Sequence, residues 1–323
     1  MEKNSLFVLI ALLALTCCKK KVISEGNIPD PPYSTDPSFD FSKEGLTPEG
    51  IAYDGKSRNF LVSSISTGIV GKVSLQGNYT PFLNNANVIS SLGIKVDSGR
   101  NRILVAIGDL KSAPSTATRD NIAALGIYNQ TTGVQEKYID LGILKKNSKH
   151  LANDIAVDKE GNVYITDSFS PIIYKVDING NASIFIENAA FNPLKVGDMA
   201  GLNGILFHPD GYLVVAKMDE GILFKIPLSD PAKFTKISSV SLPGDGILLT
   251  HNNKIVVMTP TLNTAYLVSS TNAWSTATVE KTFATGNVWP TTLTYKEHVI
   301  FALYTYDIGT APANKFTIKS LPF

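Results

Sequence analysis

The sequence has little cysteine, almost no net charge and no long hydrophobic run. Its two cysteines, Cys17 and Cys18, are adjacent near the N-terminus. The rest of the chain therefore has no disulfide, catalytic thiol or cysteine-ligated zinc site. Lysine and arginine (29) nearly balance aspartate and glutamate (28), and no basic stripe with interleaved aromatic residues is present, so nucleic acid is not an expected partner. The apolar run LFVLIALLAL is too short for a membrane-spanning helix, which needs about 20 residues.

This apolar run has the character of an export signal. Lys3 precedes it and the sequence LTCCKKK ends it. Leu15 lies three positions before Cys18 with small residues between, which resembles a bacterial lipobox and predicts lipidation of Cys18. Cys17 is the alternative acceptor, since Ala14 lies at the same offset. An ordinary secretory signal, in which neither cysteine is modified, is the other interpretation.

These features predict a three-part chain. Residues 1–18 are a lipoprotein signal peptide, and the Pro- and Ser-containing stretch 19–37, which lacks periodicity, is a flexible tether. The lipid would hold the protein to a bacterial membrane, facing the periplasm or the cell surface. The remaining segment, 38–323, is rich enough in apolar residues to bury a large core, because the chain is 44% hydrophobic and 18% charged.

A degenerate sixfold repeat organises this segment. Each repeat opens with a residue that is usually polar, followed by a small residue and usually Ile. A strand, a turn and a second strand come next, as in ANDIAVDKEGNVYITDS. The spacing of the repeats, mostly 40 to 50 residues, is that of a four-stranded propeller blade. The opening positions are Glu49, Leu92, Asn153, Asn203, Asp245 and Thr292.

The repeats predict an all-β fold, a six-bladed β-propeller over residues 38–323. The last repeat lacks a strand, which SFDFS (38–42) can supply from the other end of the chain, closing the ring and covering exposed sheet edges. A long gap between the second and third openings contains 108–125, predicted as an inserted loop or short helix. A β-sandwich or two smaller β domains are the alternatives.

In a propeller the inner strands run the same way along the axis, so their first residues ring one mouth of the central channel. Four of these residues, Glu49, Asn153, Asn203 and Asp245, carry side-chain oxygens. Two carboxylates and two amides, with no His or Cys, suit Ca²⁺ best, with Mg²⁺, Mn²⁺ or Zn²⁺ as alternatives. The other interpretation is that Asn and Asp begin strands because they favour turns. The backbone is expected to approach the axis closely where glycine follows the opening residue, at Gly50, Gly204 and Gly246.

Further residues are expected near the same mouth. Asp154 is a substrate-facing acid, a support for the ligands or a turn cap; Asp167 lines the site or supports a strand end; Lys217 binds an anionic substrate group or is a surface lysine. The candidates to line a substrate site are Asp154, His150, Asp167, Lys217, Trp289 and Tyr306. The remaining histidines, His208, His251 and His298, fall in hairpins at the opposite mouth.

The motifs PEG at Glu49, ND at Asn153, NG at Asn203 and DG at Asp245 resemble the SMP-30/gluconolactonase family and, more distantly, the paraoxonases. The resemblance implies a calcium-containing six-bladed propeller in which these four residues bind a catalytic divalent metal and Asp245 can activate water. The implied activity is hydrolysis of small lactones or esters. Separately, the protein is expected to be a monomer. Gly246 stands where paraoxonases have Asn, and their active-site His pair has no match here. A non-catalytic binding propeller with a structural calcium, or a strictosidine-synthase-like condensing enzyme, are the alternatives.

Overall fold

The computed structural model describes residues 37–83, 85, 87–110, 121–195, 200–306 and 314–323. The predicted signal peptide, Cys17, Cys18 and nearly all of the tether lie outside this range. In the part of the chain that is described, no helix combines the length and apolarity needed to cross a bilayer.

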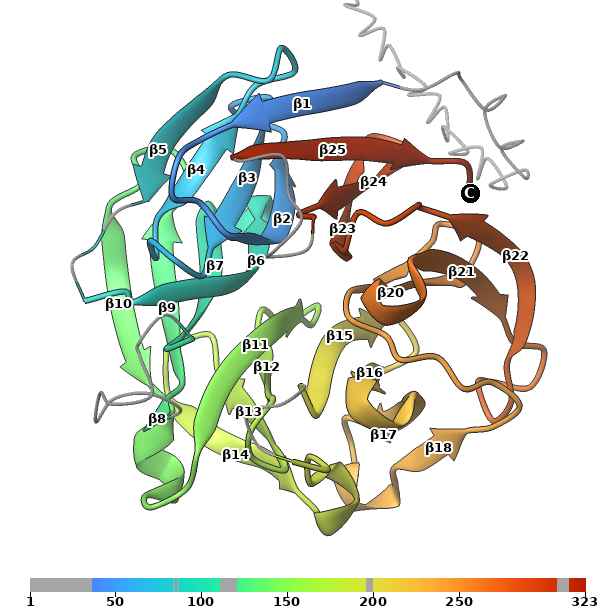
Figure 1. Cartoon of the computed structure of the whole chain (residues 1–323). Helices are drawn as coiled ribbons and strands as arrows, with labels where there is room; N and C mark the ends of the chain where they lie inside the picture. Colours follow the sequence, from blue (N-terminus) through green and yellow to red (C-terminus); the bar gives the residue numbers. More distant parts are fainter. Residues whose placement is uncertain (1–36, 84, 86, 111–120, 196–199, 307–313) are drawn as a thin grey trace, which may run out of the picture. The chain divides into compact units, whose positions relative to one another are not determined.

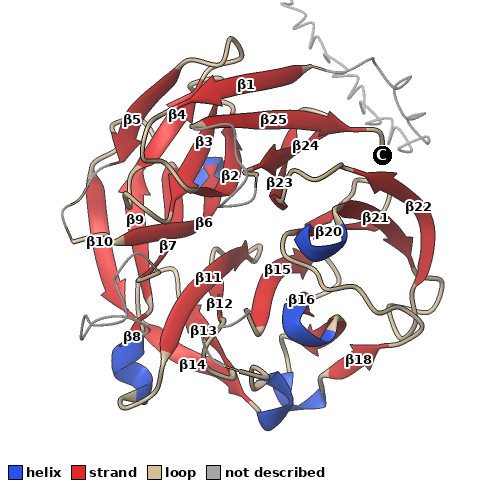
Figure 2. Cartoon of the chain, in the orientation of Figure 1, coloured by secondary structure: helices blue, strands red, loops and turns tan. Residues whose placement is uncertain are grey.

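Six small sheets, each built mainly of antiparallel strands, form a ring in the described part of the chain, which confirms the predicted six-bladed β-propeller (Figures 1 and 2). The inner strands of neighbouring sheets contact one another all the way round. From the inside outward, blades 1 to 3 are β2 (Pro48–Asp54), β3 (Asn59–Ser64), β4 (Val70–Val73) and β5 (Tyr79–Leu83); β6 (Ser90–Asp97), β7 (Arg102–Gly108), β9 (Ala124–Asn129) and β10 (Gln135–Asp140); and β11 (His150–Val157), β12 (Val163–Asp167), β13 (Ile172–Val176) and β14 (Ala182–Glu187).

Blades 4 to 6 repeat this order, and the N-terminal strand closes the last of them. Blades 4 and 5 are β15 (Leu202–His208), β16 (Tyr212–Lys217), β17 (Ile222–Pro227) and β18 (Thr235–Ile237); and β19 (Ile247–Leu249), β20 (Ile255–Thr259), β21 (Thr264–Ser269) and β22 (Thr278–Ala284). Blade 6 is β23 (Pro290–Lys296), β24 (Val299–Tyr304), β25 (Lys315–Leu321) and β1 (Ser38–Ser42).

The predicted ring closure is confirmed, because β1 pairs antiparallel with β25 along its whole length. Within the insertion predicted as a loop or short helix, Asn121–Ile122 form a short strand, β8, that pairs in parallel with the start of β11. The helical elements are single 3₁₀ turns: η1 (Ser98–Arg100), η2 (Gly142–Lys145), η3 (Ala189–Phe191), η4 (Met218–Glu220), η5 (Pro231–Lys233) and η6 (Pro260–Leu262).

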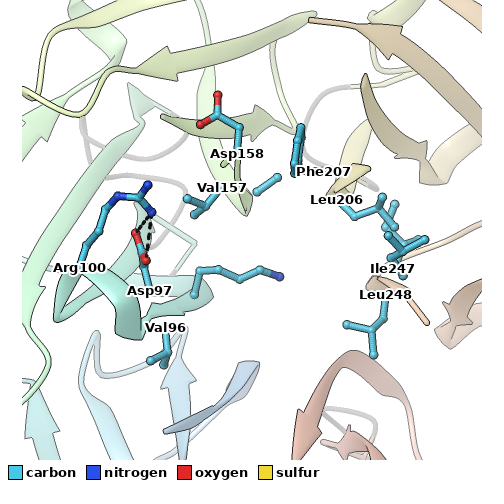
Figure 3. Close-up of a pocket in the computed structure, with 12 residues that line it drawn as sticks. Val96, Asp97, Arg100, Val157, Asp158, Leu206, Phe207, Ile247 and Leu248 are labelled. Atoms are coloured by element: carbon cyan, nitrogen blue, oxygen red, sulfur yellow. Dashed lines mark hydrogen bonds and ion pairs between the residues drawn. The ribbon is translucent and has the colours of Figure 1, made fainter. Parts of the chain in front are cut away.

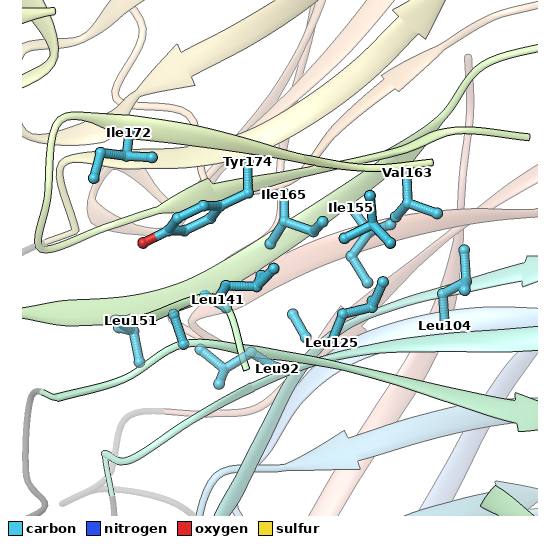
Figure 4. Close-up of a cluster of buried hydrophobic side chains, with 14 of the residues drawn as sticks. Leu92, Leu104, Leu125, Leu141, Leu151, Ile155, Val163, Ile165, Ile172 and Tyr174 are labelled. Atoms are coloured by element: carbon cyan, nitrogen blue, oxygen red, sulfur yellow. The ribbon is translucent and has the colours of Figure 1, made fainter. Parts of the chain in front are cut away.

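The core is divided among the blade interfaces. Six clusters of buried apolar side chains occur, and each fills the space between two neighbouring blades. Figure 4 shows the cluster between blades 2 and 3, in which Leu104 and Leu125 face Ile155 and Ile165. Because each sheet buries both faces against its neighbours, the inner strands are held firmly, and their first residues have fixed positions around the channel.

Candidate metal-binding collar

The opening residues of the inner strands lie in β-bulges. In β11, Ala152 pairs with Asp167, but Ile155 pairs with Ile165, so two residues of β11 lie opposite one of β12. The two bulged residues are the polar pair predicted to face the channel. Bulges at the same place occur in β2, β6, β15 and β23. A bulge bends the strand and redirects its side chains, which explains how polar residues open strands that are otherwise apolar.

The bulge in blade 6 corrects one predicted position. It contains Thr291 and Thr292, followed by Leu293, so Thr291 is the equivalent of Glu49 and the predicted opening residue Thr292 is one position too late. Two identical residues in succession leave the sequence alignment ambiguous here. In blade 5 the equivalent pair, Asp245–Gly246, directly precedes β19 and bonds to Met258 of β20 through backbone contacts of 2.8 and 2.9 Å.

Together these residues form a closed ring that we call the collar. It consists of Glu49–Gly50, Leu92–Gly93, Asn153–Asp154, Asn203–Gly204, Asp245–Gly246 and Thr291–Thr292. A Cβ atom at Gly50 would lie 2.2 Å from the carbonyl oxygen of Leu92, and one at Gly204 would lie 2.1 Å from that of Asp245. The same crowding against the next blade occurs at Gly93 and Gly246. Glycine is therefore required because neighbouring backbones touch.

Hydrogen bonds complete the ring where glycine is absent. The Asp154 carboxylate accepts a hydrogen bond from the backbone N–H of Ile205 in blade 4, at 3.2 Å. The Thr291 hydroxyl donates to the carbonyl oxygen of Glu49 in blade 1, at 2.7 Å. Every blade thus contacts the next through the collar, and the six opening positions lie around one axis.

The two collar amides have their nitrogen atoms engaged on the protein side. The Asn153 Nδ2 donates to the Ser168 hydroxyl at 2.8 Å. The Asn203 Nδ2 lies 3.4 Å from the sulfur of Met218, and the Asn203 side chain also hydrogen-bonds Asp245. This leaves the amide oxygens as the atoms that suit a hard cation.

Three carboxylates are close enough in the collar to perturb one another. Burial raises the pKa of Glu49 well above its ordinary value, and the charges of Asp245 and Asp154 add to the effect. Burial and the charge of Asp154 raise the pKa of Asp245 to about 8, although the hydrogen bond from Asn203 opposes the shift. Burial also raises the pKa of Asp154, opposed mainly by the positive charge of Lys95. A site of this kind favours a bound cation.

Hydroxyl groups on the second strands support the collar, and the sequence analysis missed them. The Ser63 hydroxyl accepts the backbone N–H of Gly50 at 2.6 Å. The Thr166 hydroxyl accepts the N–H of Asp154 at 3.1 Å and donates to the carbonyl of Asn203 at 2.7 Å. Each hydroxyl lies opposite a bulge. The signal in the sequence was the Ser or Thr near the end of VSS and YITDS.

The predicted residues His150 and Asp167 lie inside blade 3. The His150 Nδ1 is 2.7 Å from the Asp167 carboxylate and its Nε2 is 2.8 Å from the Lys145 carbonyl. Burial alone lowers the pKa of His150, but the hydrogen bond and charge of Asp167 raise it overall. Tyr174 also donates to Asp167, which accepts three backbone N–H groups, from Leu151, Phe169 and Ser170. This network supports the end of β12, the alternative role considered for Asp167.

The predicted Lys217 is also buried, and its charge is matched within the protein. Its Nζ lies 3.2 Å from the Asp219 carboxylate and pairs with Glu220. Both acids belong to η4, directly after the strand that carries the lysine. The ion pairs give Lys217 a structural role at the end of β16.

Trp289 and Tyr306 flank the inner and second strands of blade 6. Trp289 is partly exposed (38%), and both residues adopt left-handed backbone conformations, with φ of 42° and 60°. The Tyr306 hydroxyl is 2.9 Å from that of Thr317 in β25, which directs it into the blade. Of the two, Trp289 has the more exposed side chain.

The other histidines lie at the hairpin ends of the inner strands, as predicted. The His208 Nε2 bonds the Asn253 side chain at 2.5 Å. His251 packs on Tyr295 and His298, with ring centroids 4.6 and 5.5 Å apart. These contacts are structural and lie away from the collar.

The donor set of the collar fits a hard divalent cation, because it offers carboxylate and amide oxygens from four blades. Over the described ranges, no group of three or more His, Cys, Asp or Glu side chains has the arrangement of a metal site. The predicted ligand set contains only two such residues, Glu49 and Asp245, since its other members are asparagines.

No known protein family matches the sequence, and no curated protein matches it. Solved structures share the fold. Mala s 1, a major allergen of Malassezia sympodialis, is 16% identical with a TM-score of 0.69, covering 88% of this chain and 95% of the allergen. A putative gluconolactonase is 11% identical with a TM-score of 0.60, covering 88% and 92%. A luciferin-regenerating enzyme is 10% identical with a TM-score of 0.61, covering 88% and 94%.

These structural similarities support, at the level of fold, the predicted resemblance to the SMP-30/gluconolactonase family. They include a gluconolactonase-type propeller, and they cover nearly all of the described chain. At 10–16% identity they establish the six-bladed architecture. The function has to be argued from the collar.

Proposed function

We propose that this protein is a divalent-metal-dependent hydrolase of small lactones or esters, with the collar as its metal site. The observation that supports the proposal is that oxygen-bearing residues open the inner strands of four blades, with Glu49, Asp154 and Asp245 close enough for their charges to interact. Turn preference explains one polar strand opening, but it does not explain four in equivalent positions of one collar. The shared fold with a putative gluconolactonase agrees with this class of chemistry.

Glu49, Asn153, Asn203 and Asp245 would bind the cation, with Ca²⁺ as the best match. Two carboxylates supply charge, and two amides add neutral oxygens. When bound, such a cation polarises the substrate carbonyl and stabilises the negative charge that develops on its oxygen.

Asp245 is the residue best suited to accept a proton. Without metal, burial and then Asp154 raise its pKa to about 8. A bound cation would lower this pKa, so that the Asp245 carboxylate is charged and can accept a proton near neutral pH. Asp154 itself is fixed by hydrogen bonds from the backbone N–H groups of Ile155 and Ile205, at 2.8 and 3.2 Å. We therefore assign Asp245 as the general base and Asp154 as the charge that positions and tunes it.

The test is hydrolysis of a panel of lactones and aryl esters with Ca²⁺ and with EDTA. We expect metal-dependent turnover that falls about 100-fold or more in Asp245→Ala, the usual cost of losing a general base. Asp177→Ala is the control, because Asp177 is a partly exposed acid in the β13–β14 hairpin, far from the collar in the chain. Turnover that survives both EDTA and Asp245→Ala would overturn the assignment.

A non-catalytic propeller with a structural cation is the second candidate. The contacts that join every blade through the collar favour it, since a cation there would hold four blades together. Its signature is an increase in thermal stability with Ca²⁺, with no hydrolysis of any substrate in the panel.

The lipid anchor is part of the proposal. The motif around Cys18 would hold the enzyme at a membrane, outside the cytoplasm, where small lactones and esters reach it by diffusion. Mass spectrometry of the full-length protein made in a bacterial host tests it, and Cys17→Ser and Cys18→Ser distinguish the two acceptors.

A further inference from the structure

The channel contains a pocket beyond the collar. It has a volume of about 340 Å³ and is lined by the last residues of β6, β11 and β15 and by β19 (Figure 3). The collar occupies residues near the start of β6, β11 and β15 and directly precedes β19. Lys95, which lines the pocket, is three residues beyond Leu92, or about 10 Å at the rise of a strand. Most of the pocket lining therefore lies nearer the hairpin ends of these strands than the collar does.

One side of the pocket is apolar. Side chains from β15 and β19 face the charged residues of blade 2 across it (Figure 3). The apolar lining from these two strands is Leu206, Phe207, Ile247, Leu248 and Leu249. A surface of this kind binds the hydrocarbon part of a small organic molecule.

Most charged groups around the pocket have partners within the protein. Arg100 pairs with Asp97 at 3.3 Å and donates to the carbonyl of Lys159 at 2.7 Å. Asp158 accepts hydrogen bonds from Asn162 and Tyr164. These residues shape the pocket wall but do not need a ligand to satisfy them.

Lys95 is the exception. It is partly buried, and it makes no hydrogen bond or ion pair with any residue that the structure describes. Its charge acts on Asp154 without forming an ion pair. A lysine ammonium beside an apolar wall, with no direct partner, is a binding group for an anion.

We propose that this pocket binds a small organic monoanion, a carboxylate with a compact apolar body, and that Lys95 is its charge partner. The pocket lies at the small end of the range for ligand sites, which limits the size of the apolar body. A single negative charge on the ligand is favoured, because Lys95 can neutralise only one. A second negative charge would be repelled by the collar carboxylates farther along the channel.

The test is isothermal titration calorimetry with benzoate and hexanoate, using benzamide and hexanamide as neutral counterparts. EDTA is present throughout, so no carboxylate can bind through a metal at the collar. We expect both carboxylates to bind the wild-type protein and the amides to bind much more weakly. Lys95→Met should weaken carboxylate binding by about 10- to 100-fold, the usual loss for a charged hydrogen bond, and Lys95→Arg should retain most of it.

Lys56→Met is the matched control. Lys56 lies in the β2–β3 hairpin, outside the pocket, where it bonds Asn101. The control should bind carboxylates like the wild type, and circular dichroism checks that all variants fold. Absence of carboxylate binding, or equal binding by Lys95→Met, would overturn the proposal. Because EDTA is present, neither result bears on hydrolysis at the collar.

Discussion

Three acids crowd together in the collar, and their ionisation is the main residue-scale property of this protein. Glu49, Asp154 and Asp245 each have a raised pKa, with burial as the largest cause. Removing water from a carboxylate disfavours its charged form, and neighbouring carboxylates add repulsion. A divalent cation offsets both effects, so the stability of the protein should depend on pH and on metal together.

The metal-free protein should lose stability as pH rises. Native Asp245 retains its proton up to about pH 8, whereas an unfolded aspartate ionises near pH 4. Between these values the native state binds more protons, so the free energy of unfolding decreases with rising pH and is highest near pH 4. Denaturant titrations at pH 5 and pH 8 in EDTA measure the decrease, which Ca²⁺ should largely abolish.

Asp245→Asn should reduce this dependence, because it removes one of the three collar carboxylates whose pKa is raised. Asp177→Asn should leave it unchanged, because hydrogen bonds from Asn181 lower the pKa of Asp177 and keep it ionised from pH 5 to pH 8. Stability in EDTA that increases from pH 5 to pH 8 would contradict the account of the collar charges.

The sequence could not predict where some of the candidate site side chains point. His150, Asp167 and Lys217 occur at strand ends near the collar, as predicted, yet their polar groups bond to one another or to neighbouring acids inside the blades. Strand order fixes which end of the channel a residue is near. It does not fix whether the side chain points to the axis or into the blade, which depends on how the sheets pack.

The bulge is the unit that builds the collar at the scale of the single strand. It places two residues of the inner strand opposite one residue of the second strand. The inner-strand backbone then lies against that of the next blade. The sequence predicted the strands, their order and the glycines, because apolar runs, turns and repeat spacing mark them. It did not predict the bulges, since one extra residue leaves no mark in a short apolar run.

Gly50→Ala tests the contact between blades. Its Cβ would lie 2.2 Å from a backbone oxygen of Leu92, and neither backbone can move without shifting a blade. We expect a loss of about 1–3 kcal/mol in the free energy of unfolding, the usual cost of overpacking. Urea denaturation measures it.

Gly55→Ala is the control from the hairpin of the same blade. Nothing lies within 4 Å of a Cβ atom there, so the change should stay within about 0.5 kcal/mol. Equal effects of the two substitutions would show that the collar backbones are not in contact.

At the scale of the whole molecule, the ring brings distant residues to one point. Closure by β1 was predictable, because the last repeat lacked a strand and an open edge is unfavourable. Phe41 of β1 is buried against Phe316 of β25, which adds an apolar contact to the strand pairing. Closure matters for the collar because it joins blade 1, which carries Glu49, to blade 6. Glu49 and Asp245, which are far apart in the chain, are then close enough for their charges to interact.

The central claim is that four blades share one cation, and calorimetric titration of the chelator-treated protein with Ca²⁺ tests it most directly. We predict one Ca²⁺ per chain, with binding strongly weakened in Glu49→Gln and in Asp245→Asn, whose ligands come from blades 1 and 5. Asp177→Asn should bind like the wild type. Absence of Ca²⁺, Mg²⁺ and Mn²⁺ binding, or binding unaffected by both collar substitutions, would contradict the account.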